Sequence, residues 1–431
     1  MKPEARLSAA AELLDDIART GAPAEFALKR WGGAHRYAGS ADRRAIADRV
    51  YRCLRARARL AWAMGGESGR ALVIGSLALI DGLEVGQIAA LFSGQAYGPT
   101  PLTPEELGRL TAPAGEPPAW VAAGLPEFVS ADLRQRLGPD WVDEASALML
   151  PRAPIDLRVN GLIAQVDSVQ AELASEGLSA ELTPHSAWGL RLASEPPPNL
   201  QKLAAFRDGR FEVQDESSQI AAWLSGAAPG MTIVDYCAGG GGKTLALGQM
   251  LGGAGRLIAS DIDPKRLEAI RPRLARAGMA AELRRLGEAG EGMEDLVGAA
   301  DLVFVDAPCS GSGAWRRRPE DAWRLTQAEV ERLHQLQVEV LTRAARLVSP
   351  RGRLVYVTCS VLTRENEDSA AAFEAAHEQF RPVPIAQALD SPGLTAAGKS
   401  RLAEFASGHQ LRLSPRRTGA DGFFVSTYER M

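Results

Sequence analysis

The stretch of sequence that decides the fold runs from residue 232 to residue 244 and reads TIVDYCAGGGGKT. A short apolar run leads into a glycine-rich turn, and the residues after the turn have the pattern of a helix start. Glycines let the backbone approach a ligand closely, and the free amides at a helix N-terminus favour a negatively charged group. The pattern therefore predicts a strand, a cofactor-binding turn and a helix.

Two common nucleotide-binding loops do not match this turn. The P-loop spacing GxxxxGK(S/T) fails because the residue five before Gly242 is Cys237. A dinucleotide GxGxxG loop fits poorly, since Thr244 stands where the third glycine belongs. The next apolar run ends at Asp261, which is placed to bind ribose hydroxyls, as an acidic residue does in dinucleotide folds. A tight turn with a solvated carboxylate is the alternative interpretation.

The residues around this stretch alternate between apolar runs and helical patterns. Predicted strands cover residues 232–234, 256–259, 302–305 and 354–357, and helical segments separate them. Such alternation is typical of parallel strands with crossover helices, so we expect a doubly wound α/β sheet. The chain closes in a predicted hairpin formed by residues 410–413 and 423–428.

Two of the four cysteines directly follow predicted strands. Cys309 lies in the stretch DAPCSGSG at 306–313, and Cys359 lies in TCS at 358–360. Ligands of open α/β sheets bind outside the carboxyl ends of the strands, which places both thiols at that crevice. Cys53 instead falls on an apolar helix face and is expected to be a small buried hydrophobe. The cysteine spacing contains no CxxC pair, so neither a disulfide framework nor a metal site is expected.

These motifs, in this order, resemble those of the RsmB/Sun family of RNA 5-methylcytosine methyltransferases. The family carries a DxCAxxGGKT loop, a DAPCSxxG loop, a TCS turn and a closing DGFF strand, here at 235–244, 306–313, 358–360 and 421–424. The resemblance covers the chain from about Phe211 to its end. It implies a class I, Rossmann-like methyltransferase domain that uses S-adenosyl-L-methionine.

The resemblance also implies roles for individual residues. Carbon 5 of cytosine is a poor nucleophile until a thiolate adds at carbon 6, and such covalent catalysis divides one difficult step into easier ones. Cys359 would supply that thiolate and Cys309 would assist product release. Asp306 would bind the exocyclic amino group of the base, and Lys243 would contribute positive charge. The cofactor contacts would come from Cys237, Ala238, Gly239, Gly240, Gly241, Gly242, Lys243, Asp261, Arg266, Glu288 and Asp306.

The sequence departs from the family pattern at two places. Gly239 and Gly240 stand where the family usually has Ala-Pro, which predicts a less preorganised loop. Glu288 is the acidic residue available where the family tends to carry an Asp near the adenine. A further open question is the run from Arg316 to Arg318, which either favours the thiolate or binds RNA phosphates.

The predicted organisation has three domains. Residues 1–145 read as an all-helical, NusB-like RNA-binding domain, 146–212 as a small α+β (ferredoxin/RRM-like) domain with a proline-rich loop at 196–198, and 213–431 as the methyltransferase domain. Residues 1–60 contain thirteen Lys and Arg against seven Asp and Glu, although the whole chain carries a net charge of −4. One predicted helix, 40–64, has Arg52, Arg55 and Arg59 off its apolar face. These arginines either bind phosphates or form a solvated face.

The predicted function is 5-methylcytosine formation in RNA, with 16S ribosomal RNA as the favoured substrate because the helical domain accompanies the catalytic core. Transfer RNA is an alternative substrate, and a catalytically inactive RNA-binding protein of the same fold is an alternative class. DNA cytosine methyltransferases use a Pro-Cys thiol alone, so the second thiol of Cys359 favours RNA. We expect a monomeric, cytoplasmic protein without a membrane segment, since the sequence of 431 residues contains no long apolar run.

Overall fold

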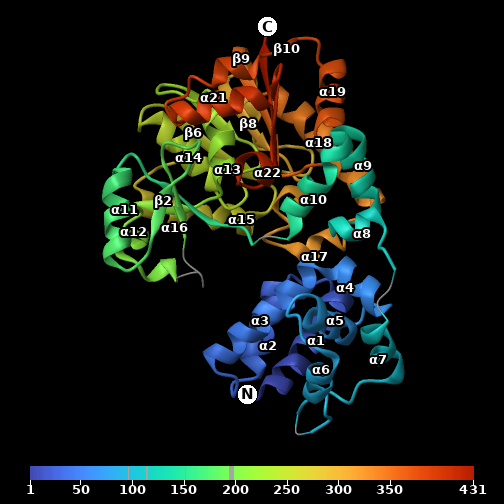
Figure 1. Ribbon diagram of the computed structural model, residues 1–431. Helices are drawn as coiled ribbons and strands as arrows, with labels where there is room; N and C mark the ends of the chain where they lie inside the picture. The colour runs from blue at the N-terminus through green and yellow to red at the C-terminus, as the bar shows by residue number, and fades with distance from the viewer. Residues whose placement is uncertain (96, 113–114, 151, 194–198) are drawn as a thin grey trace. The chain divides into compact units, whose positions relative to one another are not determined.

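The computed structural model describes residues 1–95, 97–112, 115–150, 152–193 and 199–431. They form two compact units: residues 1–152 with 314–326, and residues 153–313 with 327–431 (Figure 1). The expected proline-rich loop at 196–198 lies outside the described residues. None of the described helices has the length and apolarity that crossing a membrane would require.

The first unit is helical. Its helices are α1 (Pro3–Thr20), α2 (Ala24–Ala34), α3 (Ser40–Arg55), α4 (Arg57–Met64), α5 (Gly69–Leu79), α6 (Val85–Leu91), α7 (Pro104–Thr111), α8 (Ala119–Ala123), α9 (Glu127–Leu137) and α10 (Trp141–Met149). Apolar side chains of α1, α3 and α5 form its core, and Cys53 is fully buried there, as expected. The predicted helix over 40–64 is wrong in one respect, because Ala56 leaves helical geometry and separates α3 from α4.

A segment from the second half of the chain completes the helical unit. Residues 314–326, which include α17 (Pro319–Ala322), pack against α3. Trp323 Nε1 donates to the carbonyl of Leu54 at 3.1 Å, and the amide of Ala24 donates to Glu320 at 2.9 Å. Arg316 is buried, with 3% exposed, and Arg318 pairs with Asp321 at 3.1 Å. Burial in this unit argues against Arg316 as a phosphate-binding group.

The second unit contains a mixed sheet whose centre is parallel. Among the described residues its main order is β11-β12-β13-β9-β8-β5-β6-β7, and β10 (Phe380–Pro382) pairs with β13. The parallel strands are β5 (Thr232–Asp235), β6 (Arg256–Asp261), β7 (Glu282–Arg285), β8 (Ala300–Asp306) and β9 (Val348–Thr358). The antiparallel edge consists of β11 (Ala406–Ser407), β12 (Gln410–Leu413) and β13 (Phe423–Arg430), so the expected closing hairpin is confirmed.

Helices cover both faces of this sheet. Ile233 belongs to a core shared with α13 (Glu216–Trp223) and α14 (Gly242–Leu251), whereas its neighbour Val234 belongs to a core shared with α18 (Gln327–Ala345) and α19 (Glu367–Ala376). Successive side chains of a strand point to opposite faces, so the apolar run feeds two cores. The doubly wound fold expected from the alternating pattern is confirmed. Strand order reverses between β5 and β8, which is where such sheets bind ligands.

A small four-stranded sheet precedes this domain in the same unit. Its strands are β1 (Ile155–Val159), β2 (Ala180–Leu182), β3 (Gly189–Leu192) and β4 (Phe211–Val213) in the order β2-β3-β1-β4, with α11 (Val166–Ser175) packed on it. These strands and this helix agree with the α+β composition expected for residues 146–212. All of its described strand pairs are antiparallel.

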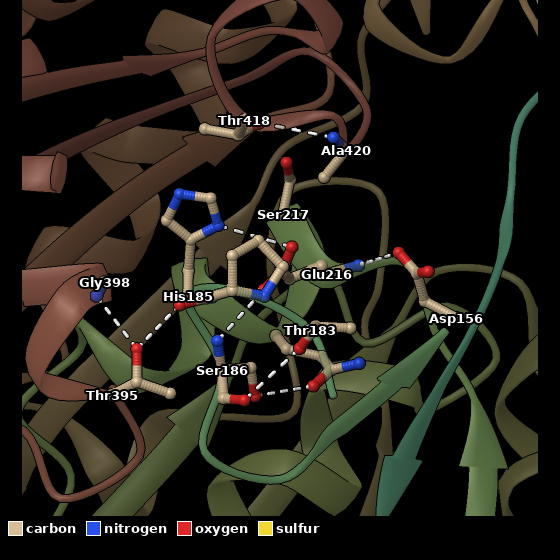
Figure 2. A network of polar contacts seen from close by, with 12 residues as sticks. Asp156, Thr183, His185, Ser186, Glu216, Ser217, Thr395, Gly398, Thr418 and Ala420 are labelled. Carbon is tan, nitrogen blue, oxygen red and sulfur yellow. Dashed lines mark hydrogen bonds and ion pairs between the residues drawn. The ribbon is translucent and has the colours of Figure 1, made fainter. Parts of the chain in front are cut away.

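A buried polar network joins the small sheet to the methyltransferase part. Glu216, at the start of α13, accepts hydrogen bonds from the amides of His185 and Ser186 at 2.7 and 3.0 Å (Figure 2). Its own amide donates to Asp156 of β1 at 3.1 Å. On the other side, the Thr395 hydroxyl donates to the carbonyl of Pro184 at 2.7 Å. The loop between β2 and β3 is thereby held by hydrogen bonds to both Glu216 and Thr395, all within the second unit.

Candidate active site

The cofactor loop lies at the point where the strand order reverses. Gly239 and Gly241 have φ of +55° and +80°, a left-handed conformation that favours glycine. A Cβ at Gly239 would collide with the guanidinium of Arg266, and one at Gly241 would meet Ile270 at 2.8 Å. The loop is therefore a close backbone cradle in which glycine is required by space as well as by dihedral angle.

Asp261 at the end of β6 holds this loop in place. Its two carboxylate oxygens accept hydrogen bonds from the amides of Gly239 and Asp263, each at 2.8 Å. Each carboxylate oxygen has two lone pairs, so the group retains capacity for ribose hydroxyls. The glycine cradle beside an acidic strand end fits S-adenosylmethionine. Arg266 lies next to Gly239 in the same cradle.

Lys243 and Asp306 meet across the switch point. Lys243 Nζ lies 2.7 Å from Asp306 Oδ2 and 5.1 Å from the ring centroid of Phe423, in the closing DGFF strand. Burial disfavours the charge on Lys243, but the interactions with Asp306 outweigh it and raise the pKa of the lysine, and the charge of Cys359 acts in the same direction. Lys243 is thus a partly buried cation at the switch point.

Asp235, the first residue of the loop motif, was not predicted as a site residue. It is fully buried, and Thr244 donates a hydrogen bond to its Oδ2 at 2.6 Å. Its Oδ1 has no partner among the described residues. Burial raises the pKa of this carboxyl to about 7 although the Thr244 hydrogen bond lowers it. The site therefore contains a carboxyl group that is partly protonated near neutrality.

The two cysteines come together. Cys309 follows β8 and Cys359 follows β9, and because these strands are parallel neighbours the two Sγ atoms lie 3.4 Å apart. The hydrogen bond with Cys359 raises the pKa of the Cys309 thiol well above its usual range, and burial and the charge of Glu365 add to the rise. The electrostatics thus favour a neutral thiol at Cys309. That thiol can donate its hydrogen bond to the sulfur of Cys359.

Sequence reasoning also missed the residues that hold the two cysteine turns. The amide of Gly313 donates to the carbonyl of Cys359 at 2.9 Å, which ties the end of the DAPCSGSG stretch to the TCS turn. Thr358 donates to Asn366 Oδ1 at 2.6 Å, and Asn366 donates to the carbonyl of Ser360 at 3.0 Å. The adjacent Glu365 is fully buried. The sequence shows an acidic residue a few positions after the TCS turn, but only the structure shows that this residue is buried.

Other predicted cofactor residues differ in their surroundings. Cys237 packs against the core on the α18 face, so the structure gives it a packing role in the loop. Glu288 is exposed, and its carbonyl accepts a hydrogen bond from Arg343 at 2.6 Å. The guanidinium of Arg273 donates to the carbonyl of Gly240, a contact that sequence reasoning did not anticipate.

Comparison with known proteins shows the family of this chain. The family model described as 16S rRNA methyltransferase RsmB/F matches residues 222–429, and the model of the ferredoxin-like domain of RsmF/B-like methyltransferases matches residues 125–198. Ribosomal RNA small subunit methyltransferase B of Xanthomonas campestris pv. campestris is 31% identical over 327 residues, which are 73% of this chain and 73% of that protein. The chain belongs to the RsmB/F family.

Two further relatives show how far the similarity extends. The protein of the same name from Pseudomonas syringae pv. tomato is 32% identical over 298 residues, which cover 68% of this chain but 64% of that relative. The crystal structure of PH0851 has a TM-score of 0.76 and 26% identity, and the match covers 100% of this chain and 99% of that one. The RsmB/F family match confirms the Rossmann-like methyltransferase domain and its expected cofactor, S-adenosylmethionine.

Proposed function

We propose that this chain transfers a methyl group from S-adenosylmethionine to carbon 5 of a cytosine in small-subunit ribosomal RNA, through a covalent adduct between Cys359 and carbon 6. The observation that carries the proposal is the pair of thiols 3.4 Å apart, at the carboxyl ends of β8 and β9. A single thiol would serve for addition. Two thiols in contact provide separate groups for addition and for release.

The residues act in sequence on the bound base. The Cys359 thiolate adds to carbon 6, and the electron pair of the carbon 5–carbon 6 double bond makes carbon 5 nucleophilic. S-adenosylmethionine, when bound, supplies the electrophilic methyl group. After methylation, a water molecule accepts the proton of carbon 5, the electron pair of that C–H bond restores the carbon 5–carbon 6 double bond, and the Cys359–carbon 6 bond breaks to free the thiolate. Cys309 assists this last step.

The charges near the two thiols support this assignment of roles. Cys359 interacts with the partly buried cation Lys243, and positive charge near a thiol in general favours the thiolate. Cys309 interacts with Cys359 and with the carboxylate of Glu365, both of which raise its pKa. A nucleophile at Cys359 and a protonated helper at Cys309 follow from this difference.

Substrate selection combines base recognition with contacts to the RNA backbone. Asp306 is suited to accept a hydrogen bond from the exocyclic amino group of cytosine. The base has to leave its stack to reach a crevice, which favours a single-stranded or looped target. In the proposed NusB-like domain, Arg52 pairs with Asp81 at 2.8 Å and Arg55 donates to the carbonyl of Arg316 at 3.2 Å, while Arg59 is exposed. Arg59 is the better candidate for phosphate contact.

The proposal is tested with purified protein and labelled S-adenosylmethionine. Protein-free small-subunit ribosomal RNA, assembled small subunits and bulk transfer RNA are supplied separately, and methylated cytosines are located by bisulfite sequencing. We expect 5-methylcytosine in the ribosomal RNA. Methylation confined to transfer RNA would show that the proposed substrate is wrong and would leave the proposed chemistry intact. Absence of 5-methylcytosine in every substrate would refute the proposal.

A further inference from the structure

The residues that follow the two cysteines share one partner. Cys309 is followed by Ser310 and Cys359 by Ser360. Both serine hydroxyls donate to the same oxygen of Glu365, Oε2, at 2.5 Å each. One carboxylate oxygen therefore joins the two turns at matching positions, one residue after each cysteine.

The second oxygen of Glu365 is also engaged. Oε1 accepts hydrogen bonds from the amide of Ser310 at 2.7 Å and from Gln337 Nε2 of α18 at 3.1 Å. The same Gln337 group donates to the carbonyl of Pro308 at 3.0 Å. The carboxylate is thereby fixed by donors from both turns and from the helix beneath them.

Hydrogen bonds to neutral groups surround this carboxylate. Glu365 is fully buried, and the donors described above are two hydroxyls, a backbone amide and a carboxamide. Burying a carboxylate away from water is costly unless hydrogen bonds compensate it, and pairing with a cation is the usual solution. A carboxylate charge that is buried among neutral donors is explained if the charge acts on a neighbouring group. Cys309 is one such group: the hydrogen bond with Cys359 and burial raise the pKa of its thiol most, and the charge of Glu365 raises it further.

We propose that Glu365 is a positioning residue for methyl transfer, which sets the relation between the two cysteine turns and keeps Cys309 a neutral thiol. The inference rests on the proposed function, because it assigns Glu365 a task in the same reaction. Through its hydrogen bonds with Ser310 and Ser360, the carboxylate fixes the positions of the two Sγ atoms. Through its charge it disfavours a second thiolate beside Cys359, so that Cys309 retains the proton it needs when the adduct breaks down.

Two substitutions separate geometry from charge. Glu365→Gln keeps the length of the side chain and removes the charge, whereas Glu365→Asp keeps the charge and shortens the reach by one methylene. Glu378→Gln is the matched control, since Glu378 is an exposed carboxylate of the same unit. Each substitution is made in the full-length protein and in a Cys359→Ala background, which leaves Cys309 as the thiol to be followed in the site.

The decisive measurement is the rate of Cys309 alkylation by iodoacetamide against pH, read by mass spectrometry of the Cys309 peptide. We expect Glu365→Gln to lower the midpoint of this profile by about one pH unit, because a like charge disfavours the thiolate. Glu365→Asp should keep the midpoint near that of the parent protein. Glu378→Gln should leave it unchanged. This readout needs neither RNA nor methylation, so it stands even if the proposed function fails.

A second measurement follows methyl transfer in the proteins that retain Cys359. We expect both Glu365 variants to lose about tenfold or more in kcat. The KM for S-adenosylmethionine should change less than about threefold, because Asp261 and not Glu365 holds the cofactor loop. A merely structural role for Glu365 would alter alkylation rates equally at every pH and leave the midpoint in place. An unmoved midpoint in Glu365→Gln, or full methylation activity in that variant, would overturn the inference.

Discussion

Cys309 and Cys359 occupy matching turns at the ends of neighbouring parallel strands, yet their charged neighbours have opposite signs. Cys359 interacts with the partly buried ammonium of Lys243, while Cys309 interacts with the buried carboxylate of Glu365. Both sulfurs are partly buried and lie within 3.4 Å of each other. Two chemically identical side chains thus lie in different electrostatic surroundings. Position in a motif alone does not distinguish a nucleophile from its helper.

The largest effect is expected from removing the thiol on the cationic side. Cys359→Ala should lower methyl transfer by about a thousandfold or more, because no adduct at carbon 6 can activate carbon 5. Labelled methyl incorporation into RNA measures the rate, and a denaturing gel shows whether an RNA-shifted protein band forms. We expect neither. An RNA-shifted band with this variant would reverse the roles of the two cysteines.

Removing the thiol on the anionic side should have a different signature. In Cys309→Ala the adduct should still form but should break down slowly, so turnover falls by about a hundredfold while an RNA-shifted band accumulates. The same gel provides the measurement, with wild type and Cys359→Ala as references. If both alanine variants methylated RNA normally, the covalent mechanism itself would be wrong.

The third prediction concerns the cation that distinguishes the two sides. Lys243→Met removes the charge while keeping an unbranched side chain, and it should lower methyl transfer by about a hundredfold, a typical loss for one preorganised electrostatic group. Lys243→Arg should retain more activity than Lys243→Met. Equal activity of the two variants would show that the charge of Lys243 does not matter.

The smallest expected effect is on stability and concerns Asp235, which adjoins Lys243 in the cofactor loop. Its folded pKa of about 7 lies above the ordinary value of 3.8, so its contribution to stability is fully present below pH 3.8 and is lost as pH rises from there through 7. Asp235→Asn removes this loss. Its free energy of unfolding relative to wild type should therefore increase with pH, by on the order of a few kcal/mol in all. Urea unfolding of both proteins at acidic, neutral and mildly alkaline pH measures the difference, and a pH-independent difference would contradict the assignment.

Much of the catalytic fold could be predicted because its signals are local. Apolar runs at 232–234, 256–259, 302–305 and 354–357 each mark a strand, since a strand buried on both faces needs apolar residues throughout. The strand β7, with the sequence ELRR, has an exposed residue at each end and two half-buried residues between them. It therefore has no apolar run that would predict a strand. It forms because β6 offers an edge for pairing.

The helical unit contains a segment whose place could not be predicted from the sequence. The segment 314–326 follows the Cys309 motif directly and reads as a catalytic loop with three consecutive arginines. It belongs to the helical unit because Trp323 and Glu320 find hydrogen-bond partners on α3 and α2. Contacts between residues more than 250 positions apart leave no periodic trace in a single sequence.

By itself, the sequence determined the strand–turn–helix order, the motif order and the placement of both cysteines at strand ends, because backbone propensity and side-chain periodicity act over a few residues. Only the tertiary structure decided that the sulfurs meet at 3.4 Å, that Lys243 pairs with Asp306, and that Glu365 joins Ser310 to Ser360. Those relations depend on which strands become neighbours and on which polar groups are buried together. Burial and pairing of charges then give two equal thiols unequal chemistry.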